Sequence, residues 1–465
     1  MWRWFAAGLS VVAMGCSAPA LDARTGELVT ALVRADELVI RARPELAAGK
    51  FQRMASAPFD FYRGTLPVFR LDWELGRTSR SGFATNTLPV LGLADPQPEN
   101  FGILVASDRT AGFEPNDFDS ADRVPYLFDL RRLLGGLALG VRLQSPGTSP
   151  AAIARDAARA YAESMQAFAA GAQPERIESP GGSLILDDLF RRSARDLASR
   201  AELTQLTVVE GETRRFRRGV IDPAEPTETL EDAPSFVVDA VPDALARLGE
   251  DPAWTVLDVV RQFGSGVASW PRVRFLVLVR GPTDAVDDDV ILELKELAES
   301  AVAGWYRPAL PADDTPARVE SALRRSWARP DADPRWFTTE WLGFPFQVRT
   351  ESEAHKNLRV SRWVGARATP VELSKLAVVL GQLLARIHGR SGAATVASVA
   401  AQVGRDIDAF ADEQANFAEV HSQASLDDYA RFQAALEQLG PTLGLRVDPR
   451  ELPSPTLQAF YGDPP

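Results

Sequence analysis

The chain has 465 residues, of which 45% are hydrophobic and 25% are charged, a composition typical of folded globular proteins and unlike that of disordered chains. This length is enough to build a large hydrophobic core in two or three lobes. The formal net charge of -12 at pH 7 disfavours contact with the phosphate backbone of nucleic acids, so we expect no nucleic-acid partner.

The N-terminus has the features of an export signal. A short basic start that contains Arg3 is followed by an apolar stretch over residues 4–15, which is too short to span a bilayer but suits the core of a signal peptide. Cys16, the only cysteine of the chain, follows the small residues Ala13 and Gly15, and this run resembles the lipobox of bacterial lipoproteins. The resemblance implies cleavage before Cys16 and attachment of lipid to that residue. The alternatives are an ordinary secretory signal, a chance cysteine in an apolar segment, and a cytoplasmic protein that is not exported.

The expected address is the cell envelope, with the lipid on Cys16 as the contact with a membrane. After Gly15 the sequence contains no apolar run of about 18 residues that could cross a bilayer. Ser17 stands where an aspartate often signals retention at the inner membrane of well-studied bacteria, so we expect the outer membrane. If the lipobox is not used, we expect a periplasmic protein.

Hydrophobic periodicity predicts helices in the first half of the chain. Ser149 and Pro150 are suited to begin a helix whose apolar residues recur at helical spacing until Gly171, and a second helix is expected over Leu184–Leu203. Residues 222–234 are rich in proline, glutamate and threonine and lack periodicity, which is typical of a linker or an exposed loop.

Strand patterns begin after Trp254. The runs Arg274–Arg280 and Val290–Lys295 are expected to form a β-hairpin with a long loop. Further strands are expected at Phe346–Arg349 and Leu358–Trp363.

A capping box at Thr369, Pro370 and Glu372 predicts a long helix that ends near His388, and the rest of the chain is expected to be mainly helical. The chain is therefore expected to comprise a signal peptide, an N-terminal segment, a catalytic-loop-like and metal-binding half, a linker region, a β-rich part and a helical C-terminal part. The bounds are 1–15 for the signal peptide, 16–50 for the N-terminal segment and 51–206 for the catalytic-loop-like half. They are 207–253 for the linker region, 254–363 for the β-rich part and 364–465 for the helical C-terminal part.

Two acidic segments lie close together in the sequence, A-D-P-Q-P-E-N-F-G at 94–102 and P-N-D-F-D-S at 115–120. Between them, a strand is expected over residues 101–107, and a returning strand is expected to begin at Phe113. This hairpin would bring polar side chains from both segments to one end of a small sheet.

The side chains concerned are Asp95, Asn100 and Asp117. Phosphoryl transfer needs one carboxylate near the acceptor hydroxyl, and an Asn and an Asp that hold magnesium on the phosphates. An Asp followed five residues later by an Asn, and then by a strand pair that ends in D-F-D, is the arrangement of protein-kinase-like catalytic loops. The alternative is that Asp95 and Asn100 cap turns and that Asp117 ends a strand.

Several motifs in the same order resemble the bacterial domain-of-unknown-function 2252 family. They are F-Q-R-M-A-S-A-P-F-D-F-Y-R-G from Phe51, the two acidic segments, Y-L-F-D-L-R-R-L from Tyr126, F-G-S-G-V-A-S from Phe263, L-E-L-K-E from Leu292, W-L-G from Trp341 and L-L-A-R-I-H-G-R-S-G from Leu383. The resemblance covers residues 51–429. In that family a glycine-rich turn and a lysine-bearing strand follow the catalytic-loop-like segments, whereas ordinary kinases place them first. This order implies an α+β, protein-kinase-like fold that is circularly permuted, with a small β-rich lobe and a larger, mainly helical lobe.

The resemblance also implies roles for individual residues, with magnesium and ATP as cofactors. The roles are Asp95 as general base, Asn100 and Asp117 as metal ligands, Lys295 as the phosphate-binding lysine, and Gly264 and Gly266 as the turn over the phosphates. Two further residues are expected near this site. Arg63 lines the same cleft or pairs with a carboxylate such as Asp72, and Asp129 fixes the loop by accepting backbone hydrogen bonds.

The chain departs from the family pattern at several positions. Where the family reads G-D-A-H-L-E-N-F-G, this chain has Ala94, Pro96, Gln97 and Pro98, and two prolines reshape a loop. Ser269 also replaces a further glycine of the turn, and an exported protein meets little ATP. Two hypotheses follow: a lipoprotein with a nucleotide or phosphate cleft that transfers phosphate to an unknown acceptor, and an inactive kinase-like envelope protein that binds a protein or glycan partner.

Overall fold

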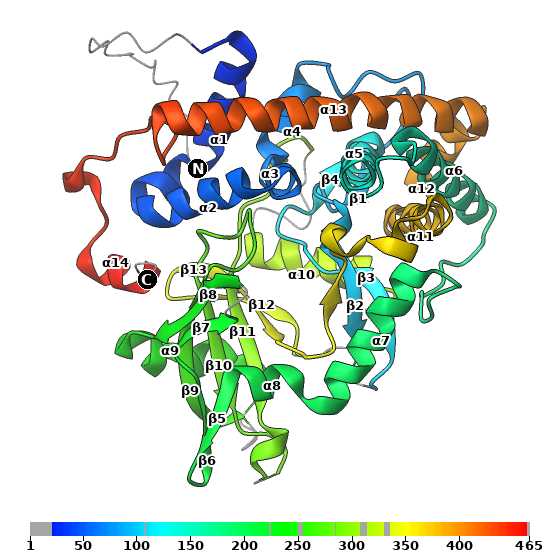
Figure 1. Ribbon diagram of the computed structural model, residues 1–465. Helices are drawn as coiled ribbons and strands as arrows, with labels where there is room; N and C mark the ends of the chain where they lie inside the picture. Colours follow the sequence, from blue (N-terminus) through cyan, green and yellow to red (C-terminus); the bar gives the residue numbers. More distant parts are fainter. Residues whose placement is uncertain are drawn as a thin grey trace.

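The computed structural model describes residues 21–106, 108–222, 225–249, 254–283, 285–306, 314–329 and 335–462 of the chain. Its helices gather mainly on one side and a large antiparallel sheet lies on the other, so the molecule has a helical part and a sheet part (Figure 1). The expected signal peptide and Cys16 lie outside the described residues. Within the described ranges, no helix is both long enough and apolar enough to cross a membrane.

Four long helices form the centre of the helical part. They are α5 (Tyr126–Gln144), α6 (Pro150–Ala169), α11 (Pro370–Gly389) and α13 (Ile407–Leu439). α6 packs along both α11 and α13, and α5 is buried over most of its length because its sequence is apolar nearly all round. The helices predicted to begin at Pro150 and Pro370 are confirmed, each with the expected capping side chain, Ser149 and Thr369.

Further helices complete this part: α1 (Ala23–Ala42), α2 (Pro44–Ser56), α3 (Pro58–Gly64), α4 (Leu66–Glu74) and α12 (Ala393–Val403). The N-terminal helices lie against one end of α13 (Figure 1). One hydrophobic cluster joins Phe51 of α2, Phe432 of α13 and Val267, which belongs to the sheet part. The N-terminal segment is therefore a structural bridge between the two parts of the molecule.

The sheet part contains seven antiparallel strands in the order β12, β13, β11, β10, β9, β8, β7. Their bounds are β7 (Gly219–Asp222), β8 (Glu225–Asp232), β9 (Val256–Phe263), β10 (Arg274–Val279), β11 (Val290–Glu296), β12 (Phe337–Trp341) and β13 (Phe344–Thr350). The predicted hairpin is confirmed, since β10 pairs with β11 and Arg274 lies opposite Lys295.

Helices flank this sheet. α9 (Ser235–Leu245) and α14 (Pro455–Tyr461) pack on the face that carries Phe275, and α10 (Thr315–Ser326) lies beside β12 and β13. α7 (Leu184–Ser199) and α8 (Ala201–Leu206) lead from the helical part to the sheet (Figure 1). The face of the sheet opposite to Phe275 turns toward the helical part.

A small three-stranded sheet lies between the two parts, in the order β14, β2, β3. Its strands are β2 (Phe101–Val105), β3 (Ala111–Pro115) and β14 (Lys356–Asn357), and a second pair is formed by β1 (Val90–Gly92) and β4 (Asp122–Val124). β2 and β3 confirm the predicted strand pair between the two acidic segments. The short 3-10 helix η1 (Pro98–Asn100) precedes β2.

The structure differs from expectation in two segments, residues 207–253 and residues 358–363. Residues 207–253 contain β5 (Thr207–Glu210), β6 (Thr213–Phe216), β7, β8 and α9, where a linker was expected. The strand expected over Leu358–Trp363 is instead a turn of 3-10 helix, because the pairing with β2 ends at Asn357. The C-terminal part is helical, but its last helix α14 packs against the sheet. With 53% helix and 17% strand, the broad prediction of a mixed helix-and-sheet fold is confirmed.

Candidate functional site

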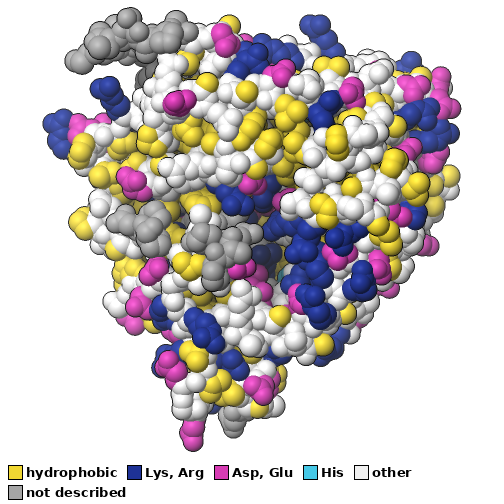
Figure 2. Space-filling view, viewed as in Figure 1, with side chains coloured by type: hydrophobic (Ala, Val, Ile, Leu, Met, Phe, Trp, Pro, Cys, Tyr) yellow, Lys and Arg dark blue, Asp and Glu magenta, His cyan; other side chains and the backbone are white. Residues whose placement is uncertain are grey.

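A cleft of about 620 Å³ separates the helical part from the sheet part. Figure 2 shows a hollow at this place with many Lys and Arg side chains around it. The predicted residues Asn100, Asp117, Lys295, Gly264 and Gly266 all line this cleft. Residues from three separate stretches of the sequence, 100–117, 264–266 and Lys295, are thus brought to one cavity.

The glycine-rich turn connects β9 to β10 at one end of the cleft. Gly264 has φ +76° and Gly266 has φ +82°, in the left-handed region that favours glycine. A Cβ atom on Gly264 would lie 1.8 Å from the carbonyl oxygen of Thr227, so no other residue fits there. The hydroxyl of Ser265 accepts a hydrogen bond from Arg274 on β10.

The turn is held from outside by the N-terminal helices. Trp270 packs so closely on α2 that a Cβ atom on Gly49 would lie 2.2 Å from its indole nitrogen. Arg43, between α1 and α2, donates to the carbonyl oxygen of Pro271 at 2.8 Å and forms a buried ion pair with Glu296 on β11. Together with the buried Val267, these contacts fix the turn against the helical part.

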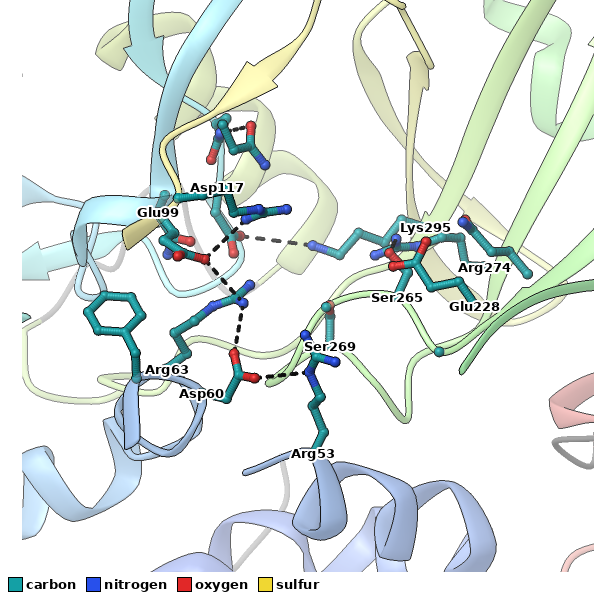
Figure 3. A pocket seen from close by; sticks show the side chains of 18 of the residues that line it. Arg53, Asp60, Arg63, Glu99, Asp117, Glu228, Ser265, Ser269, Arg274 and Lys295 are labelled. Atoms are coloured by element: carbon teal, nitrogen blue, oxygen red, sulfur yellow. Dashed lines mark hydrogen bonds and ion pairs between the residues drawn. The ribbon is translucent and has the colours of Figure 1, made fainter. Parts of the chain in front are cut away.

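Lys295 extends from β11 into the cleft toward the second acidic segment (Figure 3). Its Nζ lies 2.8 Å from Oδ2 of Asp119 and 3.9 Å from Oδ1 of Asp117. Burial disfavours the charge on this lysine, but the attraction of the two aspartates outweighs burial and raises the pKa of Lys295 above its usual value. The lysine is therefore charged and directed at the acidic segment.

The two aspartates of D-F-D have different surroundings because Phe118 lies between them in the hydrophobic core, at the edges of Trp327 and Trp336. The side chain of Asp117 is 39% exposed and faces the cleft, whereas that of Asp119 is 13% exposed. Oδ1 of Asp119 is buried and has no hydrogen-bond partner among the described residues. The sequence analysis did not predict Asp119 as a partner of Lys295. The signal that could have indicated it is that Asp119 is the second carboxylate of the D-F-D motif.

Asn100 is used within its own loop. Its side-chain nitrogen donates to the carbonyl oxygen of Asp95 at 2.8 Å, and its side-chain oxygen accepts from Nε2 of Gln97 at 2.6 Å. The backbone nitrogen of Asn116 donates to the carbonyl oxygen of Asn100 at 3.1 Å, which brings Asp117 beside it. Gln97, which replaces the histidine of the family pattern, therefore occupies one acceptor position of the expected metal ligand.

Asp95 is not among the residues that line the cleft. Its Oδ1 accepts a hydrogen bond from Nε of Arg132 at 2.7 Å, and its side chain is 16% exposed. Burial raises the pKa of Asp95, and the charge of Arg132 opposes this rise. Arg132 is fully buried on α5 and also donates to the carbonyl oxygen of Tyr62 at 2.6 Å, so Asp95 is held by a rigid partner.

The loop that carries Asp95 is anchored by Asp129, as predicted. Its carboxylate accepts from the backbone nitrogens of Leu93 at 2.7 Å and Ala94 at 2.9 Å. Nε2 of His388 lies 3.3 Å from the same carboxylate, and Nδ1 of His388 lies 2.8 Å from the hydroxyl of Tyr161. This buried network connects α5, α6 and α11 to the loop.

Alternating charges form the helical wall of the cleft. Arg63 lines the cleft and lies between Asp60 at 3.4 Å and Glu99 at 3.3 Å, and it forms no ion pair with Asp72 (Figure 3). Arg53 pairs with the same Asp60, and Arg359 pairs with the same Glu99. Three arginines therefore share two carboxylates.

The sheet wall is also charged. Glu293 on β11 is 1% exposed and pairs with Arg349 at 2.5 Å and Arg274 at 3.2 Å. Burial opposes ionisation, but these arginines outweigh it and lower the pKa of Glu293 to about 2. For the neighbouring Glu351, burial is the larger effect and raises the pKa to about 8.

The arrangement can accommodate a magnesium ion but provides few ligands for it. No group of three or more His, Cys, Asp or Glu side chains with metal-binding geometry occurs in the part of the chain that the structure describes. Asp117 and Asn100 offer two oxygen donors, which suits Mg²⁺ because this ion usually keeps several water and phosphate ligands. The donor set therefore fits magnesium held jointly with a phosphate ligand.

Comparison with known proteins gives one match. The profile of the family described as uncharacterized protein conserved in bacteria, DUF2252, matches residues 41–435. No curated protein and no solved structure matches the chain. Because the matched segment covers most of the chain, with the cleft residues named above inside it, the protein belongs to the DUF2252 family of uncharacterized bacterial proteins.

Proposed function

We propose that the cleft binds a phosphate-bearing ligand together with Mg²⁺ and transfers a phosphoryl group to an acceptor hydroxyl. The observation that carries this proposal is the meeting of a glycine-rich turn, a buried lysine and the D-F-D aspartate in one cleft. Backbone N–H groups of such turns and a lysine are suited to phosphate, and an exposed aspartate is suited to the metal that accompanies it.

The fold relationship that we propose is to protein kinases. A glycine-rich turn between two paired strands, followed by a strand with an inward lysine, faces a loop with an Asp and an Asn across a cleft. In this chain the turn and the lysine follow the loop, so the relationship is that of a circular permutation. Motif order and the shared cleft support this proposal.

In the proposed reaction the acceptor hydroxyl oxygen forms a bond to phosphorus while the bond from phosphorus to the leaving oxygen of the donor breaks. Asp95 receives the hydroxyl proton, and Mg²⁺, when bound, neutralises charge on the phosphates. Lys295 holds one phosphate, and Asp117 and Asn100 hold the metal. Arg132 positions Asp95 through the contact at Oδ1.

A second candidate function is binding without catalysis, at the envelope, with a protein or glycan partner. The observation that favours it is Asp95, which is absent from the wall of the cleft and is bound to a buried arginine. Under this candidate, Asp95→Asn leaves ligand binding unchanged and no phosphoryl transfer is found with any acceptor. This candidate is excluded if the wild-type protein turns over the phosphate donor and Asp95→Asn abolishes that turnover.

The proposal that the cleft binds a phosphate-bearing ligand is tested by thermal unfolding with MgATP. The full chain in detergent is measured for the wild type and for Asp117→Asn. A ligand at about 100 times its Kd stabilises the folded state by about 2.7 kcal/mol, so a clear rise in Tm is expected for the wild type. Asp117→Asn should lose this rise, whereas Arg191→Ala, at an exposed pair on α7, should keep it. A rise that persists in Asp117→Asn would show that the ligand binds elsewhere.

We also propose that the protein is a lipoprotein anchored through Cys16 at the outer membrane. Support comes from the apolar segment before the cysteine and from the resemblance to a lipobox. Palmitate labelling of cells should mark the protein, and Cys16→Ala should remove the label. Labelling that survives this substitution would contradict the proposal.

A further inference from the structure

The wall of the cleft next to Lys295 is made of charged side chains. Glu293 precedes Lys295 by two residues on β11, so both side chains point to the same face of the sheet. Across the sheet, Glu293 lies opposite Leu276 on one side and opposite Arg349 on the other. The ion pair between Glu293 and Arg349 thus covers the sheet surface that lies beyond the lysine.

A nucleobase needs apolar surface to be buried, because ligand pockets of this size are usually lined by hydrophobic and aromatic groups. Four apolar side chains at this cleft are already covered by their own neighbours, with Leu276 1%, Val360 2%, Leu206 3% and Phe59 7% exposed, and only Ala57, Pro58 and Leu143 among the described lining residues offer partly exposed apolar surface. A base placed against the sheet would instead desolvate the Glu293 ion pair, which is costly. The cleft therefore offers little to a purine ring.

Positive groups, by contrast, occur on both walls (Figures 2 and 3). Lys295 and Arg274 lie opposite each other in neighbouring strands of the sheet wall. On the helical wall, Arg53, Arg63 and Arg359 share two carboxylates and keep an excess of positive charge. Arginine and lysine hold phosphate oxygens by charge-assisted hydrogen bonds, so more than one phosphate can be held along the cleft.

Two acidic side chains of the cleft, Glu351 beside the sheet wall and Glu202 on α8, weaken this positive charge less than their number suggests. Burial raises the pKa of Glu351 to about 8, and burial also raises the pKa of Glu202. Burial therefore favours the neutral form of both carboxyl groups. Asp117 remains exposed in the cleft and is the carboxylate available to a magnesium ion.

We propose that the donor bound here is a linear condensed phosphate, recognised through its phosphates and its magnesium without a nucleobase. The inference rests on the proposed function and narrows its substrate class. It also agrees with the expected export of the chain to a compartment that holds little ATP. Lys295, Arg274 and the glycine-rich turn hold one end of the phosphate chain, and the arginines of the helical wall face the other.

The test measures the Kd of magnesium tripolyphosphate and of MgATP by titration calorimetry on the full-length wild-type protein. The two Kd values should agree within about threefold, and GTP and CTP should match ATP, because the base adds no binding energy. Asp117→Asn should weaken both ligands at least about tenfold, and Arg191→Ala should weaken neither. The Tm of the unliganded Asp117→Asn protein, compared with wild type, verifies that this variant is folded.

The outcomes separate the two proposals. ATP binding that is at least about tenfold tighter than tripolyphosphate binding would overturn the inference and leave the proposed function in place. Binding of neither ligand would overturn both. The two ligands could also bind equally well with affinities that Asp117→Asn leaves unchanged. That result would overturn both proposals, since the phosphates would then lie outside the assigned site.

Discussion

Glu351, at the end of the sheet wall, combines partial burial with a ring of charged neighbours. Burial and the nearby carboxylates of Glu293 and Glu202 raise its pKa, against the attraction of Arg349, from the ordinary 4.5 to about 8. Because the folded state holds this proton more tightly than the unfolded state, the contribution to stability is complete below pH 4.5 and is lost as the pH rises through about 8.

Glu351→Gln should therefore stabilise the protein at alkaline pH. At pH 9 the substitution removes a charge that folding buries, so the unfolding free energy should rise by about 1 kcal/mol, and at pH 4 this gain should vanish. Denaturant unfolding at the two pH values measures it. Glu340→Gln, at an exposed position of β12, is the control; an equal gain in both variants would mean that burial of Glu351 is not the cause.

At the scale of single residues, the sequence predicted which residues lie in the cleft better than it predicted the contacts that they make. Spacing and family motifs pointed to Asn100, Asp117 and Lys295, and all three lie in the cleft. The same reasoning could not reveal that Arg132 binds Asp95, because these residues are far apart in the sequence and meet only when α5 packs behind the loop. The anchoring by Asp129 was predictable, since a carboxylate at the start of a helix near a tight loop is a ready acceptor.

Among the elements, α2 has an unexpected influence on the cleft because it supports the glycine-rich turn. In Gly49→Ala, the added methyl group would overlap the indole of Trp270 and move the turn. We expect the unfolding free energy to fall by about 1 kcal/mol through overpacking. The affinity for the magnesium-bound phosphate ligand should also fall, because the turn carries Gly264 and Gly266.

Gly26→Ala in α1 is the matched control for that prediction. A Cβ atom on Gly26 meets no atom within 4 Å, so alanine should stabilise the helix by about 0.5–1 kcal/mol and leave ligand affinity unchanged. Thermal unfolding and calorimetry measure both effects. Unchanged affinity in Gly49→Ala would indicate that the turn does not depend on Trp270.

Helices and strands with a strong hydrophobic pattern were predicted well, and those with a weak hydrophobic pattern were not. The strands β10 and β11 are largely apolar and regular, and both strands and their pairing in a hairpin were predicted. β8 was expected to be a linker because its sequence E-P-T-E-T-L-E-D has one large apolar residue, Leu230, among a proline and several acidic residues and threonines. Its strand form is stabilised by backbone pairing with β7 and β9, which a local pattern does not reveal.

For the molecule as a whole, described helices on both sides of the family match at 41–435, α1 and α14, complete the hydrophobic clusters of the fold. α14 lies far from the match in sequence, yet Phe460 is 2% exposed and packs with Phe275 and Phe344 against the sheet. Arg261 of β9 also donates to the carbonyl oxygen of Tyr461. The C-terminal segment is thus part of the core of the sheet.

Phe460→Ala should therefore destabilise the protein by about 3–5 kcal/mol, the usual cost of emptying a buried phenylalanine site. Chemical denaturation measures this loss. Thr456→Ala, at an exposed position of the same helix, should change the unfolding free energy by less than about 0.5 kcal/mol. Similar losses for the two variants would mean that α14 contributes through its helix alone.

The attachment of the glycine-rich turn to α2 also has a kinetic consequence. Because Val267, Trp270 and Arg43 hold the turn in place, a ligand meets a site that needs no closing motion. Association should then follow a single bimolecular step whose rate depends on diffusion and on attraction between opposite charges. Raising the ionic strength should therefore change the arrival rate of an anionic ligand much more than its departure rate.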